Sequence, residues 1–437
     1  YVLDPETNTY IIKANDYINE DNILKGEVTI PSEYKNKPVG IIGESAFRGF
    51  NEITKINIPN TVKTIKNNAF SGCTKLETLV IPSTVEMIES GIVSGCYDLK
   101  SLTIPFLGDK LDSEENAYIG YLFNCSNYNI PYSLQNVKIT GGSFIGNKAF
   151  SECDNILQII LPNTIKRIGN EAFAKCSSLV SINLPDSVES LGFSSFSYNR
   201  SLRFIYIKSN IINIPYNCFY GCVNLVIVTQ TLDDMAGWMN DWDDDCIVKY
   251  VGVEPDEIYT IDSNVCLIKK DTKEARLIRY TGFGKNTNVP RSIKVNEEDI
   301  PVKTIEEGAF YNCKELNNLT IFNPDIKVNG EKVFDRLENC KTYFGLSEKP
   351  TNWDEYLLDD LIVYWNINES KYREQDGIVY IYDDKEHTVT VTNHLNEIEK
   401  VIIPDSIKFN TNNYRVSKIS ERAFYKNEIV KEVSLPI

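Results

Sequence analysis

The sequence lacks most of the residues that enzymes and membrane anchors need. It has 2 histidines and 3 methionines in 437 residues, and no segment approaches the roughly 18 consecutive apolar residues of a membrane-spanning helix. No Gly-x-Ser-x-Gly motif is present, and so little histidine leaves serine and cysteine nucleophiles without an activating base. His387 and His394 have no cysteine or carboxylate at zinc-site spacing, so we expect both at the surface. We therefore predict a protein that is not an enzyme and uses no cofactor or metal.

Positive charge is also scarce. The chain has 61 acidic and 45 basic residues, which gives a net charge of -16. An acidic surface repels phosphate backbones and anionic lipid headgroups, so we expect no nucleic-acid partner and no direct membrane insertion. The hydrophobic fraction of 42% is sufficient for a substantial core. The sequence starts at Tyr1 without a signal peptide or methionine, and we expect it to be a fragment of a larger protein.

An internal repeat organises almost the whole chain. Ile-Pro or Leu-Pro pairs recur at steps of 23 residues, as at Ile58, Ile81 and Ile104. After the proline, each unit has a Thr/Ser-Val-x-x-Ile segment, an Ala-Phe pair, a corner that is often Gly-Cys, and a Leu-x-x-Leu-x-Ile segment. The Ala-Phe pair or a near variant recurs at Ala46-Phe47, Ala69-Phe70, Ala149-Phe150, Ala172-Phe173, Ser195-Phe196, Ala309-Phe310 and Ala423-Phe424.

This spacing is typical of a leucine-rich repeat. Leu76, Leu79 and Ile81 fit the L-x-x-L-x-L pattern, in which a short strand directs these residues inward and the intervening ones outward. A single unit cannot bury its apolar edge, so stability comes from stacked neighbours. The proline ends each strand at a fixed place, and the Phe of Ala-Phe fills the interior of the convex side. We predict an α/β repeat solenoid of about 23-residue units, with short parallel strands forming a concave sheet.

Three arrays are expected, at residues 1–250, 251–365 and 366–437, the last being the start of a truncated array. Each begins with two β-rich runs joined by a polar turn, which we interpret as a β-hairpin that caps the first coil. These paired runs lie at 1–3 with 10–13, 266–270 with 275–280, and 377–382 with 388–392. The first two arrays end in Trp-containing segments, at Trp238 and Trp353, so we expect breaks near Tyr250 and Trp365.

One repeat in the first array is longer than the others. The step from Ile104 to Ile139 is 35 residues, and the polar segment 109–116 within it is expected to form a protruding loop. Insertions in solenoids emerge on one face, which is often the binding face.

The repeat unit resembles a known family. Ile-Pro-x-x-Val-x-x-Ile-x-x-x-Ala-Phe-x-x-Cys-x-x-Leu is similar to the BspA-like leucine-rich repeats, and 104–108 with 121–123 and 137–142 is similar to an expanded repeat of that family. The resemblance implies a secreted or wall-attached bacterial surface protein, implicated in adhesion to host matrix proteins and other cells, with no catalytic motif. Departures are mild: Phe50, Asn199 and Asn427 replace the corner Cys, and Ile92-Val93 replaces Ala-Phe.

Cysteine offers the most tempting chemical signal. Six of the 11 cysteines occupy the repeat corner: Cys73, Cys96, Cys153, Cys176, Cys222 and Cys313. Consecutive coils would place equivalent Cα atoms about 5 Å apart, which suits a disulfide, but the side chains would run parallel. We expect buried thiols that fill the core, with disulfides or metal binding as the alternative. Cys218 and Cys222 have a metal-like spacing, yet Cys218 stands where other units have Ala.

An aspartate cluster provides a weaker signal. Asp241, Asp243, Asp244 and Asp245 could hold calcium, but the cluster lacks the Gly and the distant Glu of an EF-hand loop. We do not predict a calcium site there.

The outward strand positions give a candidate binding surface, which we call the concave strip. The third and fifth positions of each Leu-x-x-Leu-x-Leu strand face the concave side of the first array. These positions are Lys55, Asn57, Thr78, Val80, Ser101, Thr103, Asn136, Lys138, Gln158, Ile160, Ser181, Asn183, Phe204 and Tyr206. None is acidic. Either strands simply disfavour Asp and Glu, or the strip binds a ligand with Phe204 and Tyr206 as an aromatic anchor.

Two functions remain open on the sequence. The first is an extracellular binding or adhesion module that recognises a host matrix protein, a cell-surface protein or a glycan. The alternative is a structural spacer that displays another domain of a longer surface protein, and an enzyme acting on glycans is a distant third. A binding module should have an uncharged or aromatic patch aligned over several repeats, whereas a spacer should be uniformly charged.

Overall fold

The computed structural model describes residues 1–13, 24–208, 210–231, 233–243, 246–251, 257–269, 271–338, 340–351, 353, 357–359, 361–394, 400–424 and 430–435. The chain divides into two compact units, Tyr1–Glu254 and Pro255–Ile437, here called unit 1 and unit 2. Each is described by itself. No helix among the described residues is long and apolar enough to cross a membrane.

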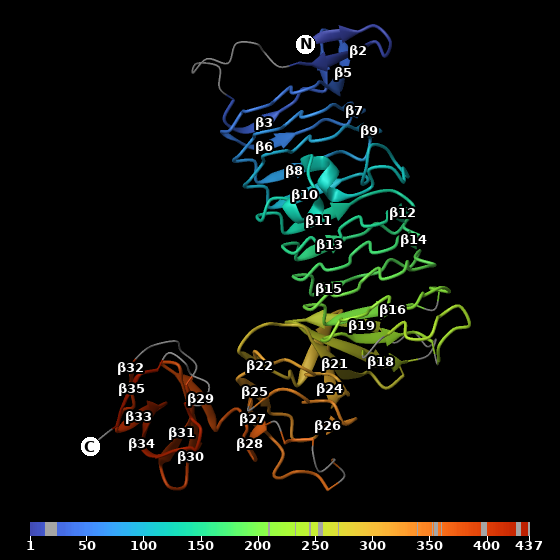
Figure 1. Cartoon of the computed structure of the whole chain (residues 1–437). Coiled ribbons are helices and arrows are strands. Elements are labelled where there is room, and N and C mark those ends of the chain that lie inside the picture. The colour runs from blue at the N-terminus through green and yellow to red at the C-terminus, as the bar shows by residue number, and fades with distance from the viewer. Residues whose placement is uncertain are drawn as a thin grey trace. The chain divides into compact units, whose positions relative to one another are not determined.

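Unit 1 is a stack of coils, each of which contributes one short parallel strand to the concave side (Figure 1). Equivalent repeat positions pair directly, since Thr78 lies beside Ser101 and Ser101 beside Asn136. The predicted leucine-rich-repeat solenoid with parallel strands is confirmed. The strands are β3 (Gly26–Thr29), β6 (Ile53–Asn57), β8 (Thr78–Val80), β10 (Ser101–Ile104), β11 (Asn136–Ile139) and β13 (Gln158–Ile160), followed by β15 (Ser181–Ile182), β16 (Phe204–Ile207), β17 (Val226–Thr229) and β18 (Ile247–Tyr250).

A second ladder of very short strands runs along another side of unit 1. It comprises β1 (Val2–Asp4), β2 (Thr9–Ile12), β4 (Glu33–Tyr34), β5 (Lys37–Ile42), β7 (Thr64–Ile65), β9 (Met87–Ile88), β12 (Phe144–Ile145) and β14 (Arg167–Ile168).

The expanded repeat adds two 3-10 helices, η2 (Ile119–Phe123) and η3 (Asn127–Asn129). The described residues contain no α-helix, so the helical part of the expected α/β class is represented only by these two turns, and tight turns form the convex side.

The phenylalanines of the Ala-Phe pairs stack through the interior of unit 1. Phe150, Phe173, Phe196 and Phe219 are fully buried, and their successive ring centroids lie 5.6, 5.2 and 5.4 Å apart with nearly parallel planes. Trp242 continues the stack edge-on at 6.0 Å from Phe219. Offset aromatic pairs at this spacing are favourable beyond the area they bury. The predicted interior position of these rings is confirmed.

The corner residues bind one coil to the coil before it. The thiol of Cys176 donates to the carbonyl oxygen of Phe150 at 3.1 Å, and the thiol of Cys73 makes the same contact with Phe47 at 3.2 Å. Asn199, which replaces the corner cysteine, donates from Nδ2 to Phe173 at 2.9 Å. At these corners the buried donor adds a hydrogen bond to the space-filling role expected from the sequence, whereas Phe50 at the first corner only fills space.

Unit 2 begins with the hairpin predicted near residue 266. β19 (Glu257–Ile261), β20 (Asn264–Lys269) and β21 (Glu274–Tyr280) form an antiparallel sheet, and β21 pairs in parallel with β24 (Glu298–Ile305). Lys270, at the end of the predicted run, lies outside the described residues. The coils that follow contribute β22 (Asn286–Asn288), β23 (Ser292–Val295), β25 (Asn318–Ile321), β26 (Lys327–Val328), β27 (Cys340–Phe344) and β28 (Leu361–Tyr364).

A second hairpin of the same design follows within unit 2. β29 (Tyr372–Gln375), β30 (Ile378–Asp383) and β31 (Thr388–His394) are antiparallel, and β31 pairs in parallel with β34 (Asn412–Ile419). β32 (Lys400–Ile402), β33 (Ser406–Phe409) and β35 (Glu432–Ser434) complete the described strands. The main hydrophobic clusters of unit 2 are centred on Phe310 and on Tyr380. The division into three arrays, with breaks near Tyr250 and Trp365, stays a prediction.

Thiol chemistry provides a first test of this packing. All 11 cysteines lie among the described residues, and none forms a disulfide. Burial raises the pKa of the Cys73 and Cys176 thiols to about 12, which suppresses the reactive thiolate. We expect a disulfide reagent to react slowly with the native chain and to titrate close to 11 thiols after denaturation without reductant. A count near one in the denatured chain would contradict this description.

Asn199 provides a test of the corner hydrogen bond. Its Nδ2 has two carbonyl acceptors, whereas its buried Oδ1 has no hydrogen-bond partner. Asn199→Ala should cost about 2 kcal/mol of unfolding free energy, because buried carbonyls lose their donor. Asn199→Cys keeps a donor and removes the unsatisfied oxygen, so its stability should lie within about 1 kcal/mol of the parent. Denaturant unfolding measures both, and equal losses would show that the donor is unimportant.

Candidate binding surface

The concave strip is exposed along most of unit 1. Every outward position from Lys55 to Asn183 is exposed or half-buried, whereas the alternating inward residues are buried except for the half-buried Ile58. The largest exposed apolar side chains are Val80 on β8, with 56% of its surface accessible, and Ile160 on β13, with 43%. Leu157, directly before β13, is 46% exposed beside them. The strip is thus a neutral to weakly basic surface with apolar side chains at intervals.

The sheet begins one strand earlier than the sequence indicated. β3 pairs in parallel with β6 and places Glu27 beside Lys55 and Thr29 beside Asn57. The Glu27 carboxylate accepts hydrogen bonds from Lys55 at 2.9 Å and Asn57 at 2.8 Å, and these contacts hold its pKa below the ordinary value. One acid therefore lies at the edge of the strip, neutralised by its neighbour. The missed signal was the Ile30-Pro31 pair, which precedes the Ile58-Pro59 pair by more than the usual 23-residue step.

Oppositely charged side chains on consecutive coils of unit 1 form ion pairs. Lys75 binds Glu52 at 2.8 Å, and Lys175 binds Glu152 at 2.7 Å. These exposed pairs add little stability individually. Each pair neutralises two opposite charges on neighbouring coils.

The far end of the strip is buried, which corrects one expectation. Phe204 keeps only 6% of its surface accessible, and its strand partner Val226 keeps none. Tyr206 is half-buried, with the Lys208 ammonium 5.9 Å from its ring centroid. The proposal of Phe204 as an exposed aromatic anchor is therefore wrong, since outward register on a strand does not by itself ensure access to solvent. The accessible strip runs from Lys55 to Asn183.

The corresponding face in unit 2 belongs to the coils that contribute β22, β25, β27 and β28, here called the second array, and it is occupied by another part of the same unit. Its outward positions Asn318 on β25 and Lys341 and Tyr343 on β27 are almost fully buried. Asn318 donates to the Tyr372 hydroxyl of β29 at 2.8 Å, and the hydroxyls of Tyr343 and Thr392 lie 2.9 Å apart. The hairpin formed by β29 to β31 thus covers this concave face through polar contacts and an edge-to-face contact between Tyr343 and Tyr372.

Lys341 is the charged centre of that contact. Its ammonium donates to the Asn393 side chain at 2.7 Å and to the Ala423 carbonyl at 3.1 Å. Burial lowers its pKa from 10.5 to about 8. Burying an ammonium group costs free energy unless its N–H groups find hydrogen-bond acceptors. Lys341 therefore favours the arrangement in which Asn393 and Ala423 supply these acceptors.

The two histidines differ in their surroundings. His387 is exposed, as expected. His394, at the end of β31, is only 6% accessible and packs against the Phe424 ring at a centroid distance of 5.8 Å. Burial and the nearby Lys341 charge lower its pKa. The surface assignment of His394 was wrong, because the end of β31 lies in the contact with the second array.

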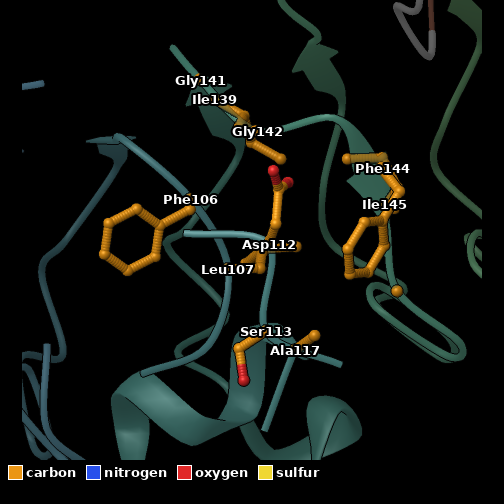
Figure 2. A pocket seen from close by; sticks show the side chains of 11 residues that line it. Phe106, Leu107, Asp112, Ser113, Ala117, Ile139, Gly141, Gly142, Phe144 and Ile145 are labelled. Carbon is orange, nitrogen blue, oxygen red and sulfur yellow. The ribbon is translucent and has the colours of Figure 1, made fainter. Parts of the chain in front are cut away.

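The polar loop of the expanded repeat is anchored to the following coil. The Asp112 carboxylate accepts a hydrogen bond from the Ser143 amide at 2.6 Å. Figure 2 shows Asp112 directed toward Gly142, with Phe144 to one side and Phe106 to the other. The cavity between them is about 10 Å³, room for little more than one water molecule. The loop is therefore exposed, as expected, but fixed in place.

No group of three or more His, Cys, Asp or Glu side chains that could hold a metal occurs in the described part of the chain. Asp241 and Asp243 of the aspartate cluster are described, whereas Asp244 and Asp245 lie outside the described residues. Asn427, a predicted corner residue, also lies outside them.

The titration of Lys341 gives a testable pH dependence. Between about pH 8 and 10.5 the unfolded chain binds a proton that the folded chain lacks, so raising the pH in this window favours folding. Below it, both states are protonated and the cost of burying the cation is fully present. From pH 7 to 9.5, the unfolding free energy of the parent should rise relative to that of Lys341→Met, which keeps the alkyl chain. Parallel pH profiles in denaturant unfolding would contradict the assignment.

Comparisons with known proteins agree with the repeat. A family model described as BspA type leucine rich repeat region matches six copies over residues 40–141, 143–231 and 274–368. No curated protein matches significantly. Three solved structures that resemble the chain are leucine-rich repeat proteins from Faecalibacterium prausnitzii, Bacteroides ovatus and T. pallidum, the first of them a cell surface protein.

These structural resemblances are distant. The F. prausnitzii protein is 17% identical with a TM-score of 0.32, covering 100% of this chain and 92% of its own. The B. ovatus protein is 22% identical with a TM-score of 0.29 over 96% and 87%, and the T. pallidum protein is 23% identical with a TM-score of 0.22 over 53% and 78%. The assignment therefore rests on the repeats themselves. With six copies matched over more than half of its length, the chain belongs to the BspA-type leucine-rich repeat family.

Proposed function

We propose that this chain is an extracellular, cell-surface binding module without catalytic activity, and that it contacts a protein partner through the concave strip of unit 1. The partner class is a host extracellular-matrix protein or a cell-surface protein. The observation that carries the proposal is the pair of concave faces in one chain: the face of the second array binds a β-hairpin, whereas the equivalent positions from Lys55 to Asn183 are accessible.

The occupied face indicates what such a surface recognises. On the second array, Asn318, Lys341 and Tyr343 bind hydroxyl and side-chain amide oxygens of a β-hairpin. The accessible strip presents the same kinds of side chain, with Asn136 and Lys138 as hydrogen-bond donors. A protein surface rich in β-structure could meet these donors with its backbone and side-chain oxygens while covering Val80 and Ile160.

The neutrality of the strip supports binding over a spacer function. Ion pairs between coils neutralise charge beside it, as at Lys100 and Glu77, which lie 3.0 Å apart. A spacer needs only a soluble surface, and the net charge of -16 already provides that. An acid-free strip with exposed Val80 and Ile160 spanning several coils is more than a spacer needs.

Introducing negative charge on the strip tests the proposal. Val80→Glu combined with Ile160→Glu places two carboxylates at exposed positions without disturbing the core. Affinity for a matrix protein bound by the parent, found with a panel of purified matrix proteins, should fall by about a hundredfold with an unchanged melting temperature. Surface plasmon resonance measures the affinity.

The matched control is Met87→Glu, because Met87 is 46% exposed but lies on the second ladder. It should bind as the parent does. Equal affinity of the strip variant and the parent would contradict the proposal and show that the interface lies elsewhere. Absence of any binding to matrix proteins or intact cells by the parent would favour the spacer.

A further inference from the structure

A groove lies over the second ladder of unit 1, on strands that do not contribute to the concave strip. Its volume is about 320 Å³, within the range of sites that bind small ligands. It extends across β12, β14 and the bridges that continue them from Arg167 to Ser190 and Asn213. Glu114, from the loop of the expanded repeat, lines it as well.

Bare backbone forms the floor of the groove. Gly146, Gly169 and Gly192 occupy equivalent positions of three consecutive coils. A Cβ on Gly192 would lie 2.4 Å from the carbonyl carbon of Gly169, so a side chain there would collide with the preceding coil. Earlier coils carry Lys66 and Glu89 at the same position. The groove therefore opens where the glycine column begins.

One wall of the groove consists of an asparagine ladder. Asn147 Oδ1 accepts a hydrogen bond from the backbone N–H of Asn170 at 2.8 Å, and Asn170 Oδ1 accepts one from the backbone N–H of Phe193 at 2.9 Å. Both side chains are exposed. Because their oxygens are committed to the backbone, and no acceptor for their Nδ2 groups occurs among the residues the structure describes, these amides remain available as donors. Phe193 and Tyr216 extend this column with rings 5.0 Å apart.

The other wall combines an aromatic ring with an ion pair. The Arg167 guanidinium lies 5.1 Å from the centroid of the Phe144 ring and 2.8 Å from the Glu114 carboxylate. The planar guanidinium of Arg167 supplies hydrogen-bond donors and the carboxylate of Glu114 supplies acceptors. Together the two groups carry no net charge.

We propose that this groove binds a neutral oligosaccharide, at a site separate from the protein-binding strip. Each sugar hydroxyl both donates and accepts a hydrogen bond. Its oxygen can accept from the side-chain amide of Asn170 or from Arg167, and its hydrogen can be donated to the Glu114 carboxylate. The apolar face of a sugar ring can pack on Phe144. The groove crosses four coils, from Phe144 to Asn213, which lie about 5 Å apart, so its length suits a short linear saccharide.

Two other ligand classes fit the groove less well. An anionic ligand would meet an arginine that Glu114 already neutralises. An extended peptide adds to a sheet at an unpaired strand edge, but Arg167 pairs with Phe144 on one side and with Ser190 on the other. The groove therefore offers no free edge along its floor.

Calorimetric titration of the full chain tests the proposal. The probes are linear fragments of neutral glucans, mannans and galactans, with a sulfated oligosaccharide and an extended peptide for comparison. Ser190→Tyr fills the groove from a half-buried position, and Glu114→Ala removes the acceptor from an exposed loop. Each should weaken binding of a neutral saccharide about tenfold or more, with an unchanged melting temperature.

The matched control is Ser181→Tyr, which introduces the same side chain on the concave strip and should bind saccharide as the parent does. No binding of any neutral fragment by the parent, or equal affinity in Ser190→Tyr, would overturn the proposal. Preferential binding of the sulfated oligosaccharide or of the peptide would also overturn it. The variant that carries both Val80→Glu and Ile160→Glu should keep its saccharide affinity, so the saccharide site and the protein-binding strip can fail independently.

Discussion

Hydrogen bonds between consecutive coils are the constraint on which the rest of this structure depends. The amide of Phe70 donates to the carbonyl of Ile92 in the next coil at 2.9 Å, and the amide of Phe173 donates to Ser195 at 2.8 Å. Corner donors such as Cys176 bind back to the coil before. Each coil thus satisfies its backbone and buries its rings only against its neighbours. Repetition of these contacts aligns equivalent residues in columns, and columns produce both the concave strip and the glycine-floored groove.

The same column geometry is used in two ways in one chain. On unit 1 the outward positions from Lys55 to Asn183 remain accessible, and ion pairs such as Lys75 with Glu52 join consecutive coils. On the second array the outward positions Lys341 and Tyr343 are buried under a hairpin that satisfies their polar atoms. The outward positions of the second array thus hold a segment of the same unit through its oxygen acceptors and the Tyr372 ring.

Repeat spacing predicted the coils, the interior phenylalanines, the buried corner cysteines and the outward direction of the strip, because each depends on neighbouring coils alone. Features that depend on distant segments were not predictable in this way. Phe204 follows the outward register yet is buried, and Lys341 stands at a position where a lysine is normally solvated. Glu27 was missed because β3 departs from the regular step, and the groove required Glu114 to reach Arg167 across 53 residues. The repeat period determines the direction of a strand side chain, whereas the burial of that side chain depends on the segments that pack over it.

The central claim is that a protein partner occupies the accessible concave strip, and covalent footprinting with a carbene reagent tests it most directly. Val80, Leu157 and Ile160 are exposed on or beside the strip, while Met87 and Val223 are exposed elsewhere on unit 1. In a complex of the full chain with a bound matrix protein, labelling of Val80, Leu157 and Ile160 should fall while labelling of Met87 and Val223 stays unchanged. Unchanged labelling of Val80 and Ile160 in the complex would contradict the account.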